Sequence, residues 1–536
     1  MKGLAVYMEN NRKSLFKIRG LKHYFPVRGK RKMFVKANDG IDIDIYDGET
    51  IGIVGESGCG KSTLGRVLLQ LYNRTEGSIL YFGKSLDDVA PGYVKKIISS
   101  LSKHGKKIAE LSAEYNLKTK ELESDPDNFT KIEEFNLAKR KYDMAYLPVV
   151  NLLGGLYTQL NNETVKTAYL ELYSAAKTRN NIRRRIAIVD LDISEMDYVL
   201  DSAKEKTDNA DKIIAPVVNI SQKGISIQQA STGKRDKLVK IKTDLEQKEA
   251  EADVLLQQKH DVVENLRAQY KDEPDFDEHE QYRSDGIDLA LLTYNEMRRL
   301  RNEMQIIFQD PYSSLNPRMT VGQIIGEGLR THNFFKKNAQ RQQELTIRVM
   351  EDCGLAPYML HRYPNQFSGG QRQRIGIARA LAVQPQFVVC DEAVSALDVS
   401  IQSQIINLLQ DLREKSNLTY MFISHDLSVI RFISDRVGVM YVGSFVELAT
   451  TEQLFEKPAH PYTVALLDAI PTTDAEGAKK EVKILEGDIP SPVNPPSGCK
   501  FHTRCVYVTD MCKEVTPLLE EIEPGHYVAC HHKLNQ

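Results

Sequence analysis

The sequence predicts an α/β protein with a mainly parallel sheet that a large helical insertion interrupts. The apolar run Thr50–Val54 is typical of a buried parallel strand, and a glycine-rich loop and a helical stretch follow it. Two further buried strands, Phe387–Cys390 and Leu418–Ser424, alternate with helical stretches, which implies crossover connections within one sheet. Between these parts, residues 85–285 are polar, charged and helical in pattern.

Length and composition set the limits of this interpretation. The chain has 536 residues, too many for one ordinary domain, and its 71 Lys+Arg nearly balance its 73 Asp+Glu. This balance argues against a strongly basic nucleic-acid binder, and we expect no nucleic-acid partner. No run approaches 18 consecutive apolar residues, and Met1–Asn10 lacks the apolar stretch of a secretory signal. We therefore expect neither a membrane span nor a signal peptide.

The elements before the insertion follow from local patterns. Ile41, Ile43 and Ile45 alternate with Asp, which predicts a half-buried strand, and a turn follows at Asp47-Gly48. A helix is expected to run through Leu64 to Leu71, and residues 77–82 read as another strand.

The insertion carries a heptad-like pattern that predicts long amphipathic helices. One seam holds Leu238, Leu245, Ala252, Lys259 and Leu266, and the other holds Ile241, Lys248, Leu255, Val262 and Gln269. A similar apolar stripe comprises Ile97, Leu101, Ile108, Leu111 and Tyr115. We expect these two helices to pair as an antiparallel hairpin with shorter helices between them. The simplest interpretation of residues 85–285 is a solvated helical insertion without a catalytic role.

The glycine-rich loop has the spacing of a phosphate-binding loop. It comprises Gly55, Glu56, Ser57, Gly58, Cys59, Gly60, Lys61, Ser62 and Thr63. Glycines let backbone N–H groups surround phosphate oxygens, and the following helix directs its N-terminus at the same anion. In this pattern Lys61 reaches the β- and γ-phosphates, and the Ser62 hydroxyl binds Mg²⁺.

Two adjacent carboxylates end the strand Phe387–Cys390. Buried carboxylates are costly unless a cation or a water network uses them. Beside a phosphate loop, Asp391 suits Mg²⁺ coordination and Glu392 suits polarising an attacking water molecule. Gln309 ends another strand and is a candidate for contact with Mg²⁺ and water, while His425 is a candidate donor to the γ-phosphate.

A second anion-binding pattern lies at Ser368-Gly369-Gly370-Gln371. It combines a hydroxyl, bare backbone and the start of a helix. One nucleotide does not need two such sites in one molecule. A head-to-tail pair of subunits does, with each pattern closing on the nucleotide of the other subunit.

In their order along the chain, these motifs resemble those of the nucleotide-binding subunits of ABC transporters. The resemblance covers about residues 20–84 and 286–450 and adds the D-loop Ser395–Asp398, so Asp398 joins the expected nucleotide site. It implies an ATPase that uses ATP and Mg²⁺, with the metal at Ser62, Gln309 and Asp391. It also implies a nucleotide-binding domain over 1–84 and 286–450, an antiparallel β subdomain, and a helical subdomain near 322–385. Phe34 or Tyr24 would stack on adenine.

Three stretches narrow the resemblance to the second ATPase subunit of oligopeptide and dipeptide importers. They are Gln305–Arg318, His460–Thr463 and Gly487–Pro492. The resemblance implies a related second ATPase, two transmembrane permease subunits and an extracytoplasmic substrate-binding protein as partners. It places the chain at the cytoplasmic face of the cell membrane. Nickel or a glycoside remains an alternative cargo, because the ATPase does not select the cargo.

Four cysteines, Cys499, Cys505, Cys512 and Cys530, crowd into the extension 451–536, where we expect a small Cys-rich domain. Such a quartet suits a metal site better than two disulfides. Four thiolates fit either a 4Fe–4S cluster or Zn²⁺. The resemblance favours the cluster, because some peptide-importer ATPases carry one in this tail; unliganded thiols are the remaining alternative.

The insertion also raises a more distant alternative. DNA-repair ABC ATPases insert long coiled coils between their motifs, but there the coil leaves after the Q-loop and carries a Cys-x-x-Cys hook. Here the insertion precedes Gln309 and contains no cysteine. The importer is therefore the preferred prediction, and nothing in the sequence assigns a role to the insertion.

Overall fold

The computed structural model describes residues 12–29, 33–125, 128–210, 218–332, 334, 339–469 and 487–535. The chain forms two compact units. The sheet unit comprises Met1–Gly83, Asp288–His332 and Gln343–Gln536, and the insertion unit comprises Lys84–Ile287 and Asn333–Gln342. Each unit is described by itself.

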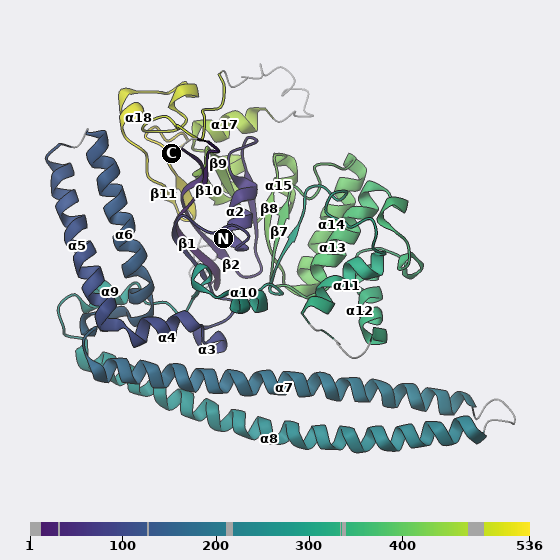
Figure 1. The fold of residues 1–536 in the computed structure, drawn as a ribbon. Helices are drawn as coiled ribbons and strands as arrows, with labels where there is room; N and C mark the ends of the chain where they lie inside the picture. Colours follow the sequence, from purple (N-terminus) through teal and green to yellow (C-terminus); the bar gives the residue numbers. More distant parts are fainter. Residues whose placement is uncertain are drawn as a thin grey trace. The chain divides into compact units, whose positions relative to one another are not determined.

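An eight-stranded sheet forms the centre of the sheet unit (Figure 1). Its order is β11-β12-β10-β9-β3-β8-β7-β6, and β3, β9, β8, β7 and β6 run parallel. Their bounds are β3 Thr50–Val54, β6 Met304–Ile307, β7 Phe387–Asp391, β8 Thr419–Ile423, β9 Arg436–Tyr441 and β10 Ser444–Thr450. The predicted parallel sheet is confirmed, and all residues of β3, β7 and β8 are buried. Parallel strands end at one edge, so the loops after β3, β6, β7 and β8 lie together.

A second, four-stranded sheet has the order β2-β1-β4-β5. Its strands are β1 Ser14–Pro26, β2 Phe34–Tyr46, β4 Glu76–Tyr81 and β5 Ile287–Asp288. β1 pairs antiparallel with both β2 and β4. Ile41, Ile43 and Ile45 of β2 are buried, as the alternation with Asp predicts.

Helix α2 (Lys61–Leu68) follows β3 and is shorter than the sequence predicts. The expected end at Leu71 is wrong because Gln70 takes a left-handed conformation with φ of 53°. Its N–H donates to Val67 O and ends the helix. The helices between residues 288 and 450 are α10 Tyr294–Leu300, α11 Val321–Thr331, α12 Ala339–Asp352, α13 Gly369–Leu381, α14 Val399–Ser416 and α15 Leu427–Ile433.

The C-terminal tail extends the large sheet, and the expected small Cys-rich domain does not form a compact unit of its own. β12 (His526–Val528) pairs antiparallel with β10, and β11 (Glu520–Glu523) pairs with β12. These strands add to one edge of the eight-stranded sheet, so the tail shares its core. The tail helices are α16 Thr451–Glu456, α17 Pro461–Asp468 and α18 Asp510–Glu514.

The insertion unit is helical and contains two long helical hairpins (Figure 1). Helix α5 (Leu101–Glu123) packs with α6 (Phe129–Leu153), and α7 (Glu163–Ala210) packs with α8 (Val218–Tyr270). Short helices α3 Leu86–Val89, α4 Gly92–Ser99 and α9 Phe276–Glu280 complete it. The predicted pairing of the 97–115 stripe with the 238–269 helix is wrong, because each long helix packs with its neighbour in sequence.

The predicted seam of α8 is half right. Leu245 and Ala252 are buried, but Leu255 and Val262 are 42% and 43% exposed. The buried partners are Leu256 and Val263, at 4% and 2% exposure. The second seam therefore lies four residues after the first, whereas the heptad reading set it three residues after.

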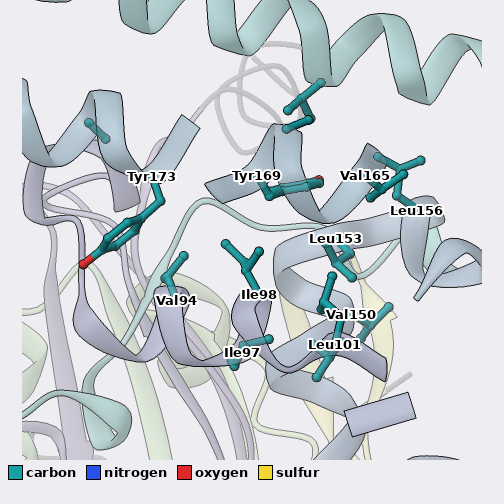
Figure 2. Packing of buried hydrophobic residues seen from close by; sticks show 14 of the residues in the cluster. Val94, Ile97, Ile98, Leu101, Val150, Leu153, Leu156, Val165, Tyr169 and Tyr173 are labelled. Carbon is teal, nitrogen blue, oxygen red and sulfur yellow. The ribbon is translucent and has the colours of Figure 1, made fainter. Parts of the chain in front are cut away.

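A hydrophobic core joins α4, α6, α7 and α8 (Figure 2). Val94 and Ile98 of α4 face Tyr173 and Tyr169 of α7. Between these side chains and Val263 lies a cavity of about 250 Å³. The base of the α7–α8 hairpin is therefore incompletely packed at this point.

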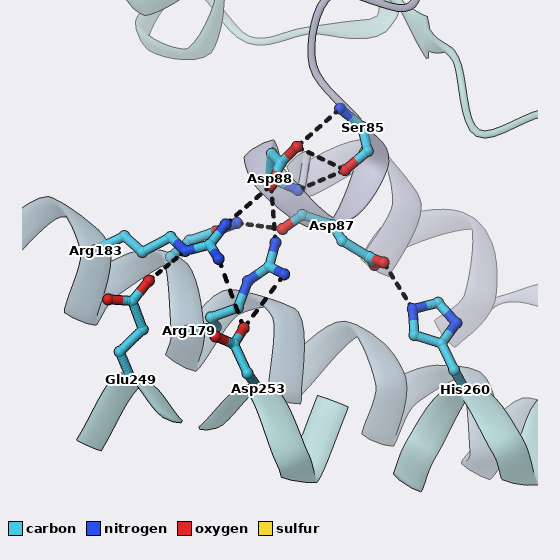
Figure 3. A network of polar contacts seen from close by, with 9 residues as sticks. Ser85, Asp87, Asp88, Arg179, Arg183, Glu249, Asp253 and His260 are labelled. Carbon is cyan, nitrogen blue, oxygen red and sulfur yellow. Dashed lines mark hydrogen bonds and ion pairs between the residues drawn. The ribbon is translucent and has the colours of Figure 1, made fainter. Parts of the chain in front are cut away.

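Ion pairs fasten α3 to the α7–α8 hairpin (Figure 3). Asp88 accepts from Arg179 at 2.9 Å and from Arg183 at 3.2 Å. His260 of α8 lies 2.7 Å from the Asp87 carboxylate, and this hydrogen bond raises the pKa of His260. Among all described helices, none is long and apolar enough to cross a membrane.

Candidate nucleotide site

The glycine-rich loop joins the buried strand β3 to helix α2. Gly55 and Gly60 have φ of 146° and 103°, conformations that favour glycine. A Cβ atom on Gly55 would lie 2.2 Å from Met440 O, and one on Gly60 would lie 2.0 Å from Ala37 O. Only glycine fits at either end of the loop, and the absence of a side chain there lets the backbone approach an anion closely.

Lys61 spans the inside of this loop. Its Nζ donates to Gly55 O at 2.7 Å and to Glu56 O at 3.0 Å, and the residue is only 5% exposed. Cys59 Sγ lies 3.8 Å from the same Nζ, and burial raises the pKa of this thiol. The Lys61 Nζ therefore lies inside the loop, where it can meet an incoming phosphate.

Ser62 and Asp391 meet at the edge of the sheet. The Ser62 hydroxyl donates to Asp391 Oδ1 at 2.5 Å, and Arg66 lies 3.3 Å from Oδ2. Asp391 is 2% exposed because it ends the fully buried strand β7. A hydroxyl and a carboxylate in contact are the oxygen donors that Mg²⁺ prefers, so the residues present fit this ion.

Gln309, Glu392 and His425 come together although they lie on three separate loops. Gln309 Nε2 donates to Glu392 Oε2 at 2.6 Å, and His425 Nδ1 lies 3.5 Å from Glu392 Oε1. Glu392 has φ of 48°, a strained conformation for a residue other than glycine. Its N–H donates to Ile423 O at 3.0 Å, which holds the turn against β8.

The Ser368–Gln371 segment forms the start of α13. Ser368 Oγ accepts from Gln371 N, and the Gln371 side chain accepts from Ser368 N, which completes a capping box. A Cβ on Gly370 would lie 2.4 Å from Ile401, so this segment packs against α14. Among the residues that the structure describes, no hydrogen bond or ion pair joins this segment to the phosphate loop.

Three further predicted residues, Asp398, Tyr24 and Phe34, have the following surroundings. Asp398 is the N-cap of α14, and its carbonyl accepts from Gln402 N at 2.8 Å. Tyr24 donates to Asp39 Oδ1 at 2.5 Å, whereas Phe34 begins β2 and is 44% exposed.

Comparisons with known proteins agree with this geometry. The family model described as ABC transporter matches residues 38–270 and 262–395, and the one described as oligopeptide/dipeptide transporter, C-terminal region, matches 446–512. AppF of Bacillus subtilis, named an oligopeptide transport ATP-binding protein, is 52% identical over 250 residues, which are 46% of this chain and 75% of AppF.

The chain belongs to the ABC transporter family.

A relative from Brucella ovis with a peptide import ATP-binding name is 54% identical over 246 residues, 46% of this chain and 77% of its own length. A solved bacterial ABC transporter cassette, MJ0796, aligns with a TM-score of 0.40 and 14% identity over 81% of this chain and 98% of its own. The two family models and the named relatives show that the protein is an ABC transporter ATPase, in the group of oligopeptide/dipeptide transporter ATP-binding subunits.

Three residues of this ABC ATPase that the sequence analysis did not single out as site residues contact the phosphate loop. Asn38 Nδ2 donates to Gly60 O at 3.1 Å, and the Tyr462 hydroxyl accepts from Glu56 N at 3.0 Å. Arg504 forms an ion pair with Glu56. Tyr462 and Arg504 lie 406 and 448 residues after Glu56, and Asn38 lies on β2, so no local motif marks the contact of these residues with the loop.

The four tail cysteines of the ABC ATPase are all free thiols. Cys499 N donates to Cys512 O at 2.8 Å, and Cys512 Sγ lies 3.4 Å from the Thr509 hydroxyl. Within the described ranges, no three or more His, Cys, Asp or Glu side chains are arranged as ligands of one metal ion. The donor chemistry fits a metal centre, but the observed arrangement does not form one.

Proposed function

We propose that this ABC ATPase hydrolyses ATP to drive the import of oligopeptides or dipeptides. The main support for this proposal is the match of residues 446–512 to the family model of the C-terminal region of oligopeptide/dipeptide transporters. The names of the relatives from Bacillus subtilis and Brucella ovis support the same cargo class. The chain would work at the cytoplasmic face of the membrane and would act on two permease subunits. An extracytoplasmic substrate-binding protein would deliver the peptide to these subunits.

A related second ATPase would complete each nucleotide site. The hydrogen bonds of Ser368 and Gln371 lie within their own helix start, which leaves the outward N–H groups of α13 for a ligand outside this chain. The phosphate loop correspondingly holds one side of a nucleotide. A head-to-tail dimer, with Asp398 near the junction, would bring the two halves together.

The residues present would hold ATP and Mg²⁺ in a defined way. The loop from Gly55 to Thr63 would bind the phosphates through its N–H groups and Lys61. Ser62, Gln309 and Asp391 would hold Mg²⁺. When bound, the ATP–Mg²⁺ complex supplies a γ-phosphoryl group that water can attack.

Glu392 is the proposed general base of this reaction. Its carboxylate can accept a proton from a water molecule, and Gln309 fixes one carboxylate oxygen through the 2.6 Å hydrogen bond. His425 lies beside the other oxygen and is more than half exposed, so its ring can turn toward a bound phosphate. The left-handed backbone of Glu392 fixes the carboxylate in this cluster.

The test is reconstitution of the ATPase with its membrane subunits in liposomes. The complex is isolated from detergent-solubilised membranes by a tag on this chain, and the co-purified subunits are identified by mass spectrometry. We expect two polytopic proteins, a second ATPase and ATP-dependent uptake of labelled peptides. Uptake of nickel or a glycoside in place of peptides would change the cargo, and recovery of DNA with nuclease subunits would contradict the importer.

We also propose that Cys499, Cys505, Cys512 and Cys530 bind a metal centre, preferably a 4Fe–4S cluster and alternatively Zn²⁺. The four thiols lie in one tail without a disulfide. Burial raises the pKa of Cys530 to about 11, and the neighbouring thiols add to this shift. Thiolates at this site would therefore need a bound cation. Metal analysis of anaerobically purified protein should find about four irons per chain; zinc alone, or no metal, would contradict the cluster.

The functional domains follow the same proposal. Residues 1–84 and 286–450 would form the nucleotide-binding domain, with a helical subdomain near 322–385. Residues 85–285 would be a separate insertion, and 451–536 the extension typical of peptide importers.

A further inference from the structure

A short segment of the C-terminal tail contacts the start of the phosphate loop. Arg504 Nη1 donates to Glu56 Oε2 at 2.7 Å, and Nη2 donates to Oε1 at 3.1 Å. This two-point pairing fixes the direction of the Glu56 carboxylate as well as its position. The Arg504 side chain is 5% exposed, so water does not compete freely for these hydrogen bonds.

The same segment reaches the end of the loop through β2. Lys500 Nζ donates to Asp39 Oδ2 at 3.0 Å and to Ser444 Oγ at 2.7 Å. Asp39 follows Asn38, whose side-chain amide donates to Gly60 O at 3.1 Å. Lys500 thus holds the strand that supports the last glycine before Lys61.

The loop is also tied to the β9–β10 turn that Lys500 contacts. Lys500 Nζ donates to Val442 O at 3.0 Å, and the next residue, Gly443, donates its N–H to Cys59 O at 2.9 Å. Both ends of the loop are therefore connected to the five-residue stretch from Lys500 to Arg504.

The segment has fixed attachments of its own. Phe501 is 2% exposed, and its ring lies 5.3 Å from that of Tyr441 and 5.4 Å from that of Tyr462, between centroids. Tyr462 in turn accepts the Glu56 N–H. The side chain and the backbone of Glu56 are thus both held by residues of the C-terminal region.

We infer that the tail segment Cys499–Cys505 braces the phosphate loop in the shape that accepts ATP, with Arg504 as a positioning residue. The inference deepens the proposed function, and it rests on that function only in requiring this loop to bind ATP. The simpler alternative is that Arg504 only anchors the tail to the sheet unit. The two differ in where a variant acts: a brace changes the loop, and an anchor changes the tail.

The expected effects follow from the loss of a charge-assisted hydrogen-bond pair. Arg504→Ala should weaken ATP binding by roughly tenfold to a hundredfold. Arg504→Lys keeps the charge but not the two-point geometry, so it should recover only part of the affinity. Glu56→Gln removes the partner charge and leaves the tail sequence intact, so it should resemble Arg504→Ala.

The experiment uses the full chain and two readouts without transport. Hydrogen exchange of the nucleotide-free protein measures the loop peptide that covers residues 55–63, and a fluorescent ATP analogue measures the dissociation constant. Lys513→Ala is the matched control, because Lys513 lies in the same tail and pairs with exposed Asp510. Arg504→Ala combined with Glu56→Gln tests whether the two residues act together.

We expect faster exchange of the loop and weaker ATP binding in Arg504→Ala and Glu56→Gln, no added loss in the double variant, and wild-type behaviour of Lys513→Ala. Loop exchange and affinity within twofold of wild type would overturn the brace. Faster exchange confined to tail peptides would also overturn it and would leave an anchor. If Arg504→Ala does not fold, Glu56→Gln decides alone. A wild-type chain that binds no ATP would instead contradict the proposed function.

Discussion

The amide of Gln309 and the carboxylate of Glu392 share a 2.6 Å hydrogen bond although 83 residues separate them. Gln309 follows β6 and Glu392 follows β7, and these parallel strands are neighbours in the sheet. The bond orients a carboxylate that lies one residue after Asp391, the partner of Ser62. The proposed catalytic group, Glu392, and the proposed magnesium-binding group, Asp391, are therefore fixed side by side at the end of β7.

Glu392→Gln should retain ATP binding and slow hydrolysis by about 10²- to 10⁴-fold, because the amide cannot accept the proton of the attacking water. The measurements are phosphate release and equilibrium ATP binding in the assembled transporter. Glu414→Gln, on the same unit but in α14, serves as the control. Turnover of Glu392→Gln within a factor of two of wild type would contradict the assignment.

Lys61→Ala should weaken nucleotide binding by at least about tenfold, because the variant loses the side chain that would contact the phosphates. In the structure this side chain lies inside the loop, against Gly55 O and Glu56 O. Fluorescence titration with an ATP analogue measures the effect. The control is Lys415→Ala, which removes an exposed lysine that pairs with Asp352. Unchanged affinity in Lys61→Ala would show that the loop does not hold phosphate as proposed.

Leu256→Ala should destabilise the α7–α8 hairpin by about 2–4 kcal/mol, because it opens a cavity in the seam. Leu255→Ala, one residue earlier and 42% exposed, should cost less than about 1 kcal/mol. Hydrogen exchange of α7 and α8 peptides compares the two variants directly. A larger destabilisation in Leu255→Ala than in Leu256→Ala would contradict this prediction and would favour the seam that the heptad pattern predicts.

Acid should destabilise the sheet unit through His460. Burial lowers the pKa of His460 to about 4, well below its ordinary value near 6.5. The unfolded chain therefore binds a proton first, and stability that is full above about pH 6.5 falls as the pH drops toward 4. The loss approaches roughly 3 kcal/mol at 1.36 kcal/mol per pKa unit.

His460→Asn tests this pH dependence. Nδ1 of His460 accepts from Tyr462 N at 3.0 Å as the cap of α17, and asparagine can supply the same acceptor without titrating. Denaturation between pH 7 and 4 should show a flatter profile for this variant. The exposed His361→Asn is the control; equal slopes for wild type and His460→Asn would refute the role of burial.

The sequence alone was enough to predict the phosphate loop and the buried parallel strands beside it. The Gly55–Thr63 loop requires glycine where the backbone turns left-handed. The apolar runs of β3 and β7 predict buried strands, which end at Val54, just before this loop, and at Asp391. Because parallel strands end at a common edge, the meeting of Ser62 with Asp391 and of Gln309 with Glu392 could be expected before the structure was known.

Contacts between distant segments were decided only by the tertiary structure. An amphipathic stripe indicates that one face of a helix packs against a partner, but it does not identify the partner. In the structure α8 packs with α7 and not with the 97–115 stripe. Residues three and four positions apart lie on the same face of a helix, so the sequence does not determine which of Leu255 and Leu256 is buried. In the structure Leu256 occupies the seam and Leu255 is exposed. The pairing of Arg504 with Glu56 spans 448 residues, and only the fold brings these two charges together.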